Sequence, residues 1–209
     1  MTHSHHELPG TEDRPLPEFS PMQKVKRRFF AMRNGALAAQ LRTAGLNYGV
    51  NFGLNIPQIK EIAAETRDSG LSSLELMRLA EALWDNVTTR ESRLLAPMLY
   101  PADIMPRELA ARWLAEAQTV EIADHLCHSL LRQLPCAPDL AREAAVRPDA
   151  TDMQRYAALR LLLNLLCSGK ADPKEVADAA TPLRACGSTL LRPLLRQIDQ
   201  ELEWLAGDE

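Results

Sequence analysis

Several features that define common protein classes are scarce in this sequence. Aromatic residues make up 5% of the 209 residues, and no stretch approaches the roughly 18 apolar residues of a membrane-spanning helix. The first 20 residues lack the apolar core of a signal peptide. The four cysteines form no Cys-x-x-Cys pair, so neither a zinc ribbon nor a redox motif is present. We therefore predict a cytoplasmic protein with reduced thiols and no membrane contact.

Motifs of several enzyme and cofactor classes are also missing. Gly49 and Gly53 are not followed by the Gly-Lys-Ser/Thr of a phosphate-binding loop, and no Gly-x-Ser-x-Gly elbow occurs. Glu121, His125 and His128 have a spacing that metal ligands can adopt, but the order His-Glu-x-x-His is absent. We expect no cofactor and no metal site.

Charge is unevenly spread along the chain. The net charge is −4, yet residues 21–50 carry six basic residues and no acid. Residues 1–20 contribute −3, which leaves −7 for residues 51–209. A basic N-terminal patch on an acidic body is able to meet phosphates along one edge. It is equally able to pair with acids of its own chain.

The hydrophobic pattern is helical almost throughout. Apolar residues recur three and four apart in segments separated by short turns that carry Pro, Gly, Asp or Asn. The predicted helices are 22–33, 35–44, 56–67, 74–84, 90–100, 106–118, 120–134, 138–146, 151–167, 172–185 and 188–206. No alternating strand pattern occurs. The sequence thus predicts an all-α protein, and we favour an α-solenoid of HEAT-like antiparallel helix pairs over a globular bundle.

The domain organisation follows from the same pattern. Residues 1–20 are rich in proline and charge, which is typical of a disordered tail. Residues 21–209 are expected to form a single HEAT-like helical-repeat domain. Trp84 and Trp113 lie among apolar residues at helical spacing, so we interpret both as core residues.

Three stretches carry a resemblance to a known family. In NFGLNIPQIKEIAAET, Gly53 lies between two apolar residues, ahead of Pro57 and an Ile-x-x-Ile-Ala helix. LAEALWDNVTTRESRLLAPMLY contains Leu-Trp, a spacer and then Glu-x-Arg-Leu, from Glu91 to Leu94. Together with VEIAD at 120–124, these stretches resemble the DNA alkylation repair family of HEAT-like-repeat DNA glycosylases. The resemblance covers roughly residues 24–165.

The resemblance implies roles for individual residues. The family's Trp-Asp-hydrophobic-hydrophobic-Asp motif aligns with VEIAD, which places Asp124 on the catalytic acid and Val120 where the family has a tryptophan. The family's Trp-x-Arg-Arg helix aligns with MQRY, which keeps Arg155 as a phosphate-binding candidate and puts Met153 and Tyr156 in place of the other two residues. The expected DNA-binding residues are Arg155, Arg93, Lys24, Arg27 and Arg28.

The chemistry of such a family needs a carboxylate. A base alkylated at N3 or N7 is cationic, and its loss passes through an oxocarbenium-like sugar that a negative charge stabilises. Flanking aromatic rings hold the electron-poor lesion, each contributing on the order of 0.5–2 kcal/mol. Because Val120 and Met153 replace two aromatic residues, lesion selection is expected to be weaker.

Periodicity alone gives Asp124 a simpler interpretation. A polar stripe runs through this helix opposite Val120, Ala123 and Cys127, and Asp124 and His128 are i,i+4 neighbours that can pair. Six arginines either line a concave DNA-binding surface or are ordinary solvent-exposed residues: Arg90, Arg93, Arg112, Arg132, Arg155 and Arg160.

Two hypotheses follow. The first is a DNA repair protein that binds duplex DNA carrying alkylated bases on a concave basic face and hydrolyses the N-glycosidic bond with Asp124. The alternative is a non-catalytic HEAT-like scaffold that binds a protein partner or a DNA structure. We favour the first.

Overall fold

The computed structural model describes residues 19–207, and these residues form helices joined by short turns. The helices are α1 (Pro21–Ala31), α2 (Gly35–Thr43), α3 (Ile56–Arg67), α4 (Ser73–Trp84), α5 (Arg90–Leu99), η1 (Ala102–Ile104), α6 (Arg107–Ala115), α7 (Val120–Ser129), η2 (Leu131–Gln133), α8 (Ala137–Val146), α9 (Asp152–Leu166), α10 (Pro173–Arg184) and α11 (Arg192–Gly207). No strand occurs in this part of the chain, which has one isolated bridge, Val50 to Thr89. The predicted all-α fold is confirmed.

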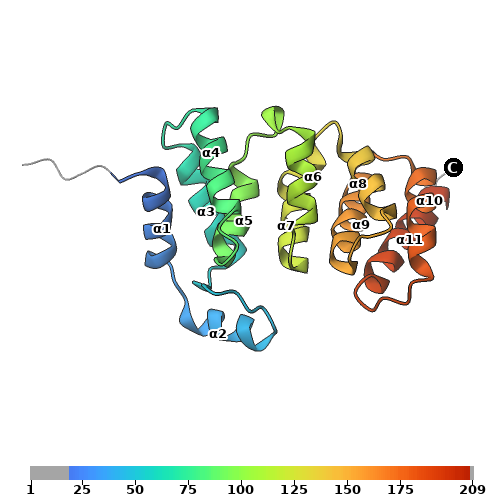
Figure 1. Ribbon diagram of the computed structural model, residues 1–209, viewed down its shortest axis with the longest axis horizontal. Coiled ribbons are helices and arrows are strands. Elements are labelled where there is room, and N and C mark those ends of the chain that lie inside the picture. The colour runs from blue at the N-terminus through green and yellow to red at the C-terminus, as the bar shows by residue number, and fades with distance from the viewer. Residues whose placement is uncertain (1–18, 208–209) are drawn as a thin grey trace, which may run out of the picture.

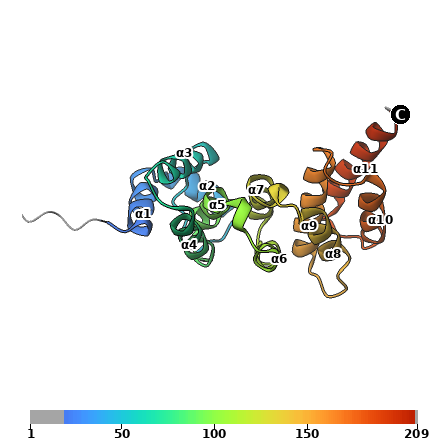
Figure 2. The ribbon, with the colours of Figure 1, turned by 90° about the horizontal axis from the view of Figure 1, so that it is seen from above.

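From α3 onward, helix pairs follow one another along the long axis of the molecule in the order of the sequence, whereas α2 lies below this row (Figure 1). α5, α7, α9 and α11 each pack on the next, and α6, α8 and α10 form a second row. Seen from above, α4, α6 and α8 lie along one edge of the molecule (Figure 2). Each helix pair therefore buries its apolar face against neighbouring pairs, as in a helical-repeat solenoid.

Local signals in the sequence explain the starts of α1, α3, α4 and α9. Side chains of Ser20, Asn55, Ser72 and Thr151 accept from the backbone N–H three residues on, and Gln or Glu at that position returns the bond. Such capping boxes satisfy N–H groups that have no partner within the helix. Of the predicted tail, residues 1–18 lie outside the described residues, whereas Phe19 and Ser20 lead into α1.

Three predicted helices are wrong by three or more residues at one end. The helix predicted over 106–118 ends at Ala115. The helix predicted over 120–134 ends at Ser129, and Leu130 leaves the helical conformation with φ −128° and ψ −64°. Pro135 disfavours a helical Leu134, which is extended instead. The helix predicted over 188–206 begins at Arg192, so that Pro193 falls in its first turn, where it costs no hydrogen bond.

None of the helices in residues 19–207 combines the length and apolar character that crossing a membrane requires.

A buried carboxylate holds the loop between α2 and α3. Glu91, fully buried in α5, accepts from the backbone N–H groups of Phe52, Gly53 and Leu54 at 3.1, 3.0 and 3.3 Å. Two of the motif stretches, at Gly53 and at Glu91, therefore meet in space. Because the loop supplies three donors to one anion, it is fixed against α5.

Gly53 is required at this loop for steric reasons. Its φ is +71°, and a Cβ atom built there would lie 2.1 Å from the carbonyl oxygen of Asn34 and 2.7 Å from the backbone nitrogen of Ala38. Neither backbone atom is able to move without shifting α2, so the loop and α2 are packed through this one residue.

Gly53→Ala should therefore destabilise the protein strongly. A positive φ costs an alanine about 1–2 kcal/mol, and the clash adds on the order of 1–3 kcal/mol. Gly70→Ala is the matched control, because Gly70 has φ +82° with nothing within 4 Å of the added atom. Urea unfolding would contradict this account if the two variants lost equal stability.

Glu91→Gln keeps the shape of the side chain but removes its charge. We expect a loss of about 2–3 kcal/mol in the free energy of unfolding, since hydrogen bonds to a charged acceptor are stronger than neutral ones. Glu108→Gln, at an exposed position of α6, should change stability little. A stability of Glu91→Gln equal to that of wild type would show that the charge is not needed.

Candidate functional site

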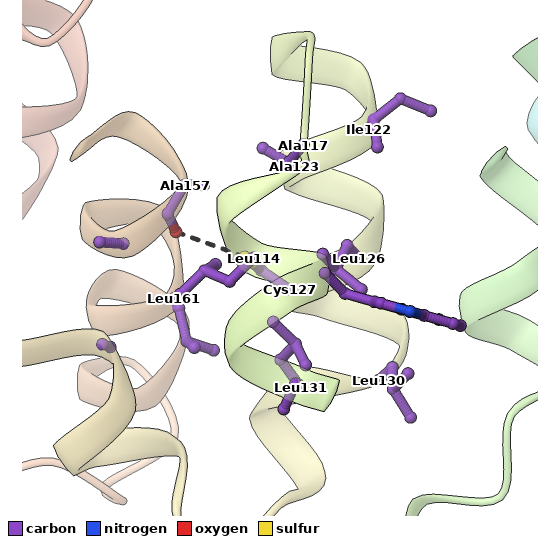
Figure 3. Close-up of a cluster of buried hydrophobic side chains, with 14 of the residues drawn as sticks. Leu114, Ala117, Ile122, Ala123, Leu126, Cys127, Leu130, Leu131, Ala157 and Leu161 are labelled. Atoms are coloured by element: carbon purple, nitrogen blue, oxygen red, sulfur yellow. Dashed lines mark hydrogen bonds between the residues drawn. The ribbon is translucent and has the colours of Figure 1, made fainter. Parts of the chain in front are cut away.

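One face of α7 forms the floor of a cleft. The opposite face is apolar, and Ile122, Ala123, Leu126 and Cys127 are buried against neighbouring helices (Figure 3). The Cys127 thiol donates to the Ala157 carbonyl of α9 at 3.4 Å, the dashed line in Figure 3. This packing fixes the rotation of α7 about its axis and turns its polar residues outward.

The cleft lies between α7, α9 and the end of α2 and has a volume of about 760 Å³. Its lining residues are Ala44, Leu46, Ile56, Val120, Glu121, Asp124, His125, His128, Arg160 and Asn164. No phenylalanine, tyrosine or tryptophan is among them. We call this hollow the Asp124 cleft.

Asp124 is held by two side chains of α9. Its Oδ1 accepts from the Tyr156 hydroxyl at 2.9 Å and from Arg160 Nε at 2.7 Å, and its Oδ2 accepts from Arg160 Nη2 at 3.1 Å. The carboxylate side chain remains one-third exposed (33%). Asp124 is thus fixed in direction while still open to the cleft. The periodicity of α7 suggests His128 as the partner of Asp124, but the structure pairs Asp124 with Tyr156 and Arg160 instead.

Both partners of Asp124 have raised pKa values. The pKa of Arg160 is raised, chiefly by its hydrogen bond to Asp124. Burial raises the pKa of Tyr156, and the negative charge of Asp124 raises it further. Both groups therefore keep their protons at neutral pH and remain donors to the carboxylate.

Val120 was expected on the apolar face and is instead 38% exposed at the rim of the cleft. It begins α7 one turn before Asp124, so its side chain and the carboxylate share a face. The aromatic ring of Tyr156 does not replace the expected tryptophan, because Tyr156 is only 8% exposed. Only its hydroxyl reaches Asp124.

An ion-pair network connects the cleft to the Gly53 loop. Arg90 of α5 donates through Nε to Glu121 at 2.8 Å, pairs with the same carboxylate through Nη2, and donates through Nη1 to the Leu54 carbonyl at 2.8 Å and to Glu91 at 3.2 Å. Burial alone would lower the pKa of Arg90, but Glu121 and Glu91 outweigh it and raise the pKa. The charge of Glu121 is therefore neutralised by Arg90, and Arg90 is in turn unavailable to a ligand.

Arg155, the phosphate-binding candidate on α9, does not line the Asp124 cleft. Its Nη2 donates to the Pro148 carbonyl at 3.3 Å, and its Nη1 lies 3.8 Å from Asp152. The arginine that meets Asp124 is Arg160. Tyr156, Arg160 and Asn164 lie four residues apart on α9, so they share one face of an otherwise apolar helix. This spacing is the sequence signal that would have pointed to Arg160.

Arg93 is buried, with 4% exposed. Its guanidinium lies over the Trp84 ring at 4.2 Å and donates to the Glu116 carbonyl at 3.3 Å. Trp84 stacks on Trp113 with ring centroids 4.4 Å apart, and both are fully buried, which confirms their assignment to the core. Arg93 therefore contributes packing where a phosphate contact was expected.

Lys24, Arg27 and Arg28 line a separate hollow of about 660 Å³ between α1, α3 and the start of α4. Arg28 is paired with Glu65 at 2.7 Å and with Glu61 at 3.1 Å. Arg27 lies over the Phe19 ring at 4.3 Å. The structure thus brings these three residues together, but apart from Asp124.

Metal coordination finds no support in residues 19–207, where no group of three His, Cys, Asp or Glu side chains is arranged to hold an ion. His125 is mostly buried beside Asp124 and lies 3.5 Å from the Ser129 hydroxyl. Burial lowers the pKa of His125 to about 4, with the charges of Glu121, His128 and Lys60 as smaller influences. The imidazole is therefore neutral at physiological pH.

The stacked helix pairs make this a helical-repeat protein, and the Asp124 cleft lies between two successive pairs. The model of the DNA alkylation repair enzyme family matches residues 25–180, which is most of the chain. The protein belongs to this family, and a role in DNA repair with DNA as its substrate follows from the membership. No curated protein and no solved structure gave a match.

The pKa of His125 predicts how stability depends on pH. Between the ordinary pKa of about 6.5 and the folded value of about 4, the unfolded chain binds a proton at this histidine that the folded chain does not, so stability falls as the pH is lowered through this window. His125→Gln should remove roughly 2–3 kcal/mol of that fall.

Urea unfolding at about pH 7 and about pH 4.5 measures the difference. His128→Gln is the comparison, because His128 is exposed on the next turn of the same helix and its pKa is lowered less than that of His125, so its replacement should remove a smaller part of the fall. Parallel losses of stability in wild type and His125→Gln would contradict the assignment.

Proposed function

We propose that the protein binds duplex DNA at the Asp124 cleft and hydrolyses the N-glycosidic bond of N3- or N7-alkylated bases. The observation that carries the proposal is the Asp124 carboxylate, fixed by Tyr156 and Arg160 and open to a cleft in a member of a DNA alkylation repair family. A carboxylate held in place stabilises positive charge without having to reorient as the charge develops.

In this proposal Asp124 stabilises the charge that develops during the reaction, and its neighbours hold it in place. As the bond to the cationic base lengthens, positive charge develops on the sugar, and Asp124 lies opposite it. Water adds to the sugar, its proton leaves to solvent or to Asp124, and the alkylated base departs as a neutral molecule. Tyr156 and Arg160 act as positioning residues for the carboxylate. Neutral His125 lies close to it without adding a positive charge.

Selection of the lesion is expected to be weak in this cleft. Its apolar wall consists of Ala44, Leu46, Ile56 and Val120, which provide contact area but no aromatic face for a cationic base. A base that is already a good leaving group depends least on such a contact, which favours 7-methylguanine and similar cationic bases as substrates.

A second candidate function is a non-catalytic scaffold that binds DNA or a protein. Two observations favour it: both oxygens of Asp124 already accept hydrogen bonds, and no phenylalanine, tyrosine or tryptophan lines the cleft beside Val120. Lys24, Arg27 and Arg28 serve either function as a further basic surface, and their part in DNA binding stays a proposal.

Release of 7-methylguanine from methylated duplex DNA tests the two functions. Wild type should release the base, and Asp124→Asn should be slower by at least ~100-fold, because the substitution keeps the acceptor for Tyr156 but removes the charge. Asp103→Asn, in the exposed turn η1, is the control and should match wild type.

Equal release by wild type and Asp124→Asn would remove Asp124 from the mechanism. No release by wild type, together with retained DNA binding, would support the scaffold.

A further inference from the structure

A second hollow adjoins the Asp124 cleft, and its charged lining residues are basic. It has a volume of about 580 Å³ and lies between α3, the end of α5 and the end of α7. Lys60, Arg67 and Arg132 are its charged lining residues, and no Asp or Glu lines it. His128 lines both hollows, so the two adjoin at this residue. We call the second hollow the basic groove.

The charges of the basic groove are not neutralised by the surrounding helices. Within residues 19–207, the side chains of Lys60 and Arg132 have neither a hydrogen bond nor an ion pair, and Arg67 is held by donating to the Met98 carbonyl at 2.8 Å. The acids of α3, Glu61 and Glu65, are engaged by Arg28 on another face. The groove therefore offers three cations to a ligand.

Two of these cations, Lys60 and Arg132, lie close enough to His128 to affect its protonation, and so does Arg160 of the Asp124 cleft. The pKa of His128 is lowered first by partial burial and then by the positive charges of Arg132, Lys60 and Arg160. Residues from α3, η2 and α9 thus act on one point at the junction of the two hollows. An anion placed there would be attracted from three sides.

The basic groove lies at one end of the Asp124 cleft only. From Asp124 to His128 the helix rises about 6 Å, roughly the rise of two nucleotides of a DNA strand. At the opposite end, where α7 begins, the lining consists of Ala44, Leu46, Val120 and Glu121, and the Glu121 carboxylate is paired with Arg90. A strand that passes through the cleft therefore meets unpaired cations on one side of Asp124 and none among the lining residues on the other.

We propose that the basic groove binds the phosphates of the DNA strand on one side of the nucleotide that occupies the Asp124 cleft, through Lys60, Arg67 and Arg132. The identity of the ligand as DNA rests on the proposed function. The phosphate contacts consequently lie on one side of that nucleotide only. The affinity for undamaged duplex comes largely from this groove.

Salt-dependent binding to an undamaged duplex tests the groove. Each lost phosphate contact lowers the slope of log K against log salt concentration by about one. Lys60→Ala/Arg132→Ala should therefore lower the slope by about two and weaken binding at low salt by roughly tenfold or more. Lys174→Ala/Arg192→Ala is the control, since both residues are exposed on the last helix pair, and its slope should equal that of wild type.

Neutral methylphosphonate linkages test the one-sidedness. In a duplex with a stable abasic-site analogue, replacing two phosphates on one side of the analogue should weaken binding to wild type but not further weaken binding to the groove variant. The same replacement on the other side should have a small and equal effect on both proteins. If replacement on either side weakened the binding of wild type equally, the proposal of phosphate contacts on one side only would be overturned.

The outcomes separate the two proposals. A groove variant with the wild-type slope overturns the groove, even if wild type releases 7-methylguanine. A lowered slope in a protein that releases no base supports the groove and removes the catalytic function. Absence of DNA binding by wild type at low salt would remove both.

Discussion

The arrangement of the site depends on one buried carboxylate. Glu91 gathers three N–H groups of the Gly53 loop and one guanidinium nitrogen of Arg90, and Arg90 extends the contact to Glu121 on α7. A buried anion without these partners would be costly, so the loop and α5 stabilise each other through Glu91, and Arg90 joins them to α7. The first turn of α7, and with it Asp124, is positioned by this network.

Much of the fold was predictable because the helix signals are local. Caps such as Asn55 and Ser72 and apolar residues three and four apart give the helices, and the family motifs at Gly53 and Glu91 lie where the loop meets α5. The end of α7 was missed because Leu130, Leu131 and Leu134 continue the apolar pattern through a turn. They are buried there by surrounding helices, which periodicity along one helix does not reveal.

The site was predictable only in part. Asp124 came from the order of motifs, whereas its partners Tyr156 and Arg160 lie 32 and 36 residues away and depend on how α9 is rotated against α7. Arg93 and Arg155 have the residue type that a phosphate site needs, but their burial and carbonyl contacts are tertiary properties. Lys60 and Arg132 come from helices that only the stacking brings together.

Asp124 and its partners belong to successive helix pairs, so the site lies across a contact between repeats. In a solenoid each pair is stabilised mainly by its neighbours, and opening begins most readily at the ends. α10 and α11 cover the side of α9 that faces away from α7, so the last helix pair separates the site from the end of the solenoid. It is able to open transiently while Arg160 stays in contact with Asp124, and amide hydrogens of α11 should exchange well before those of α7 and α9.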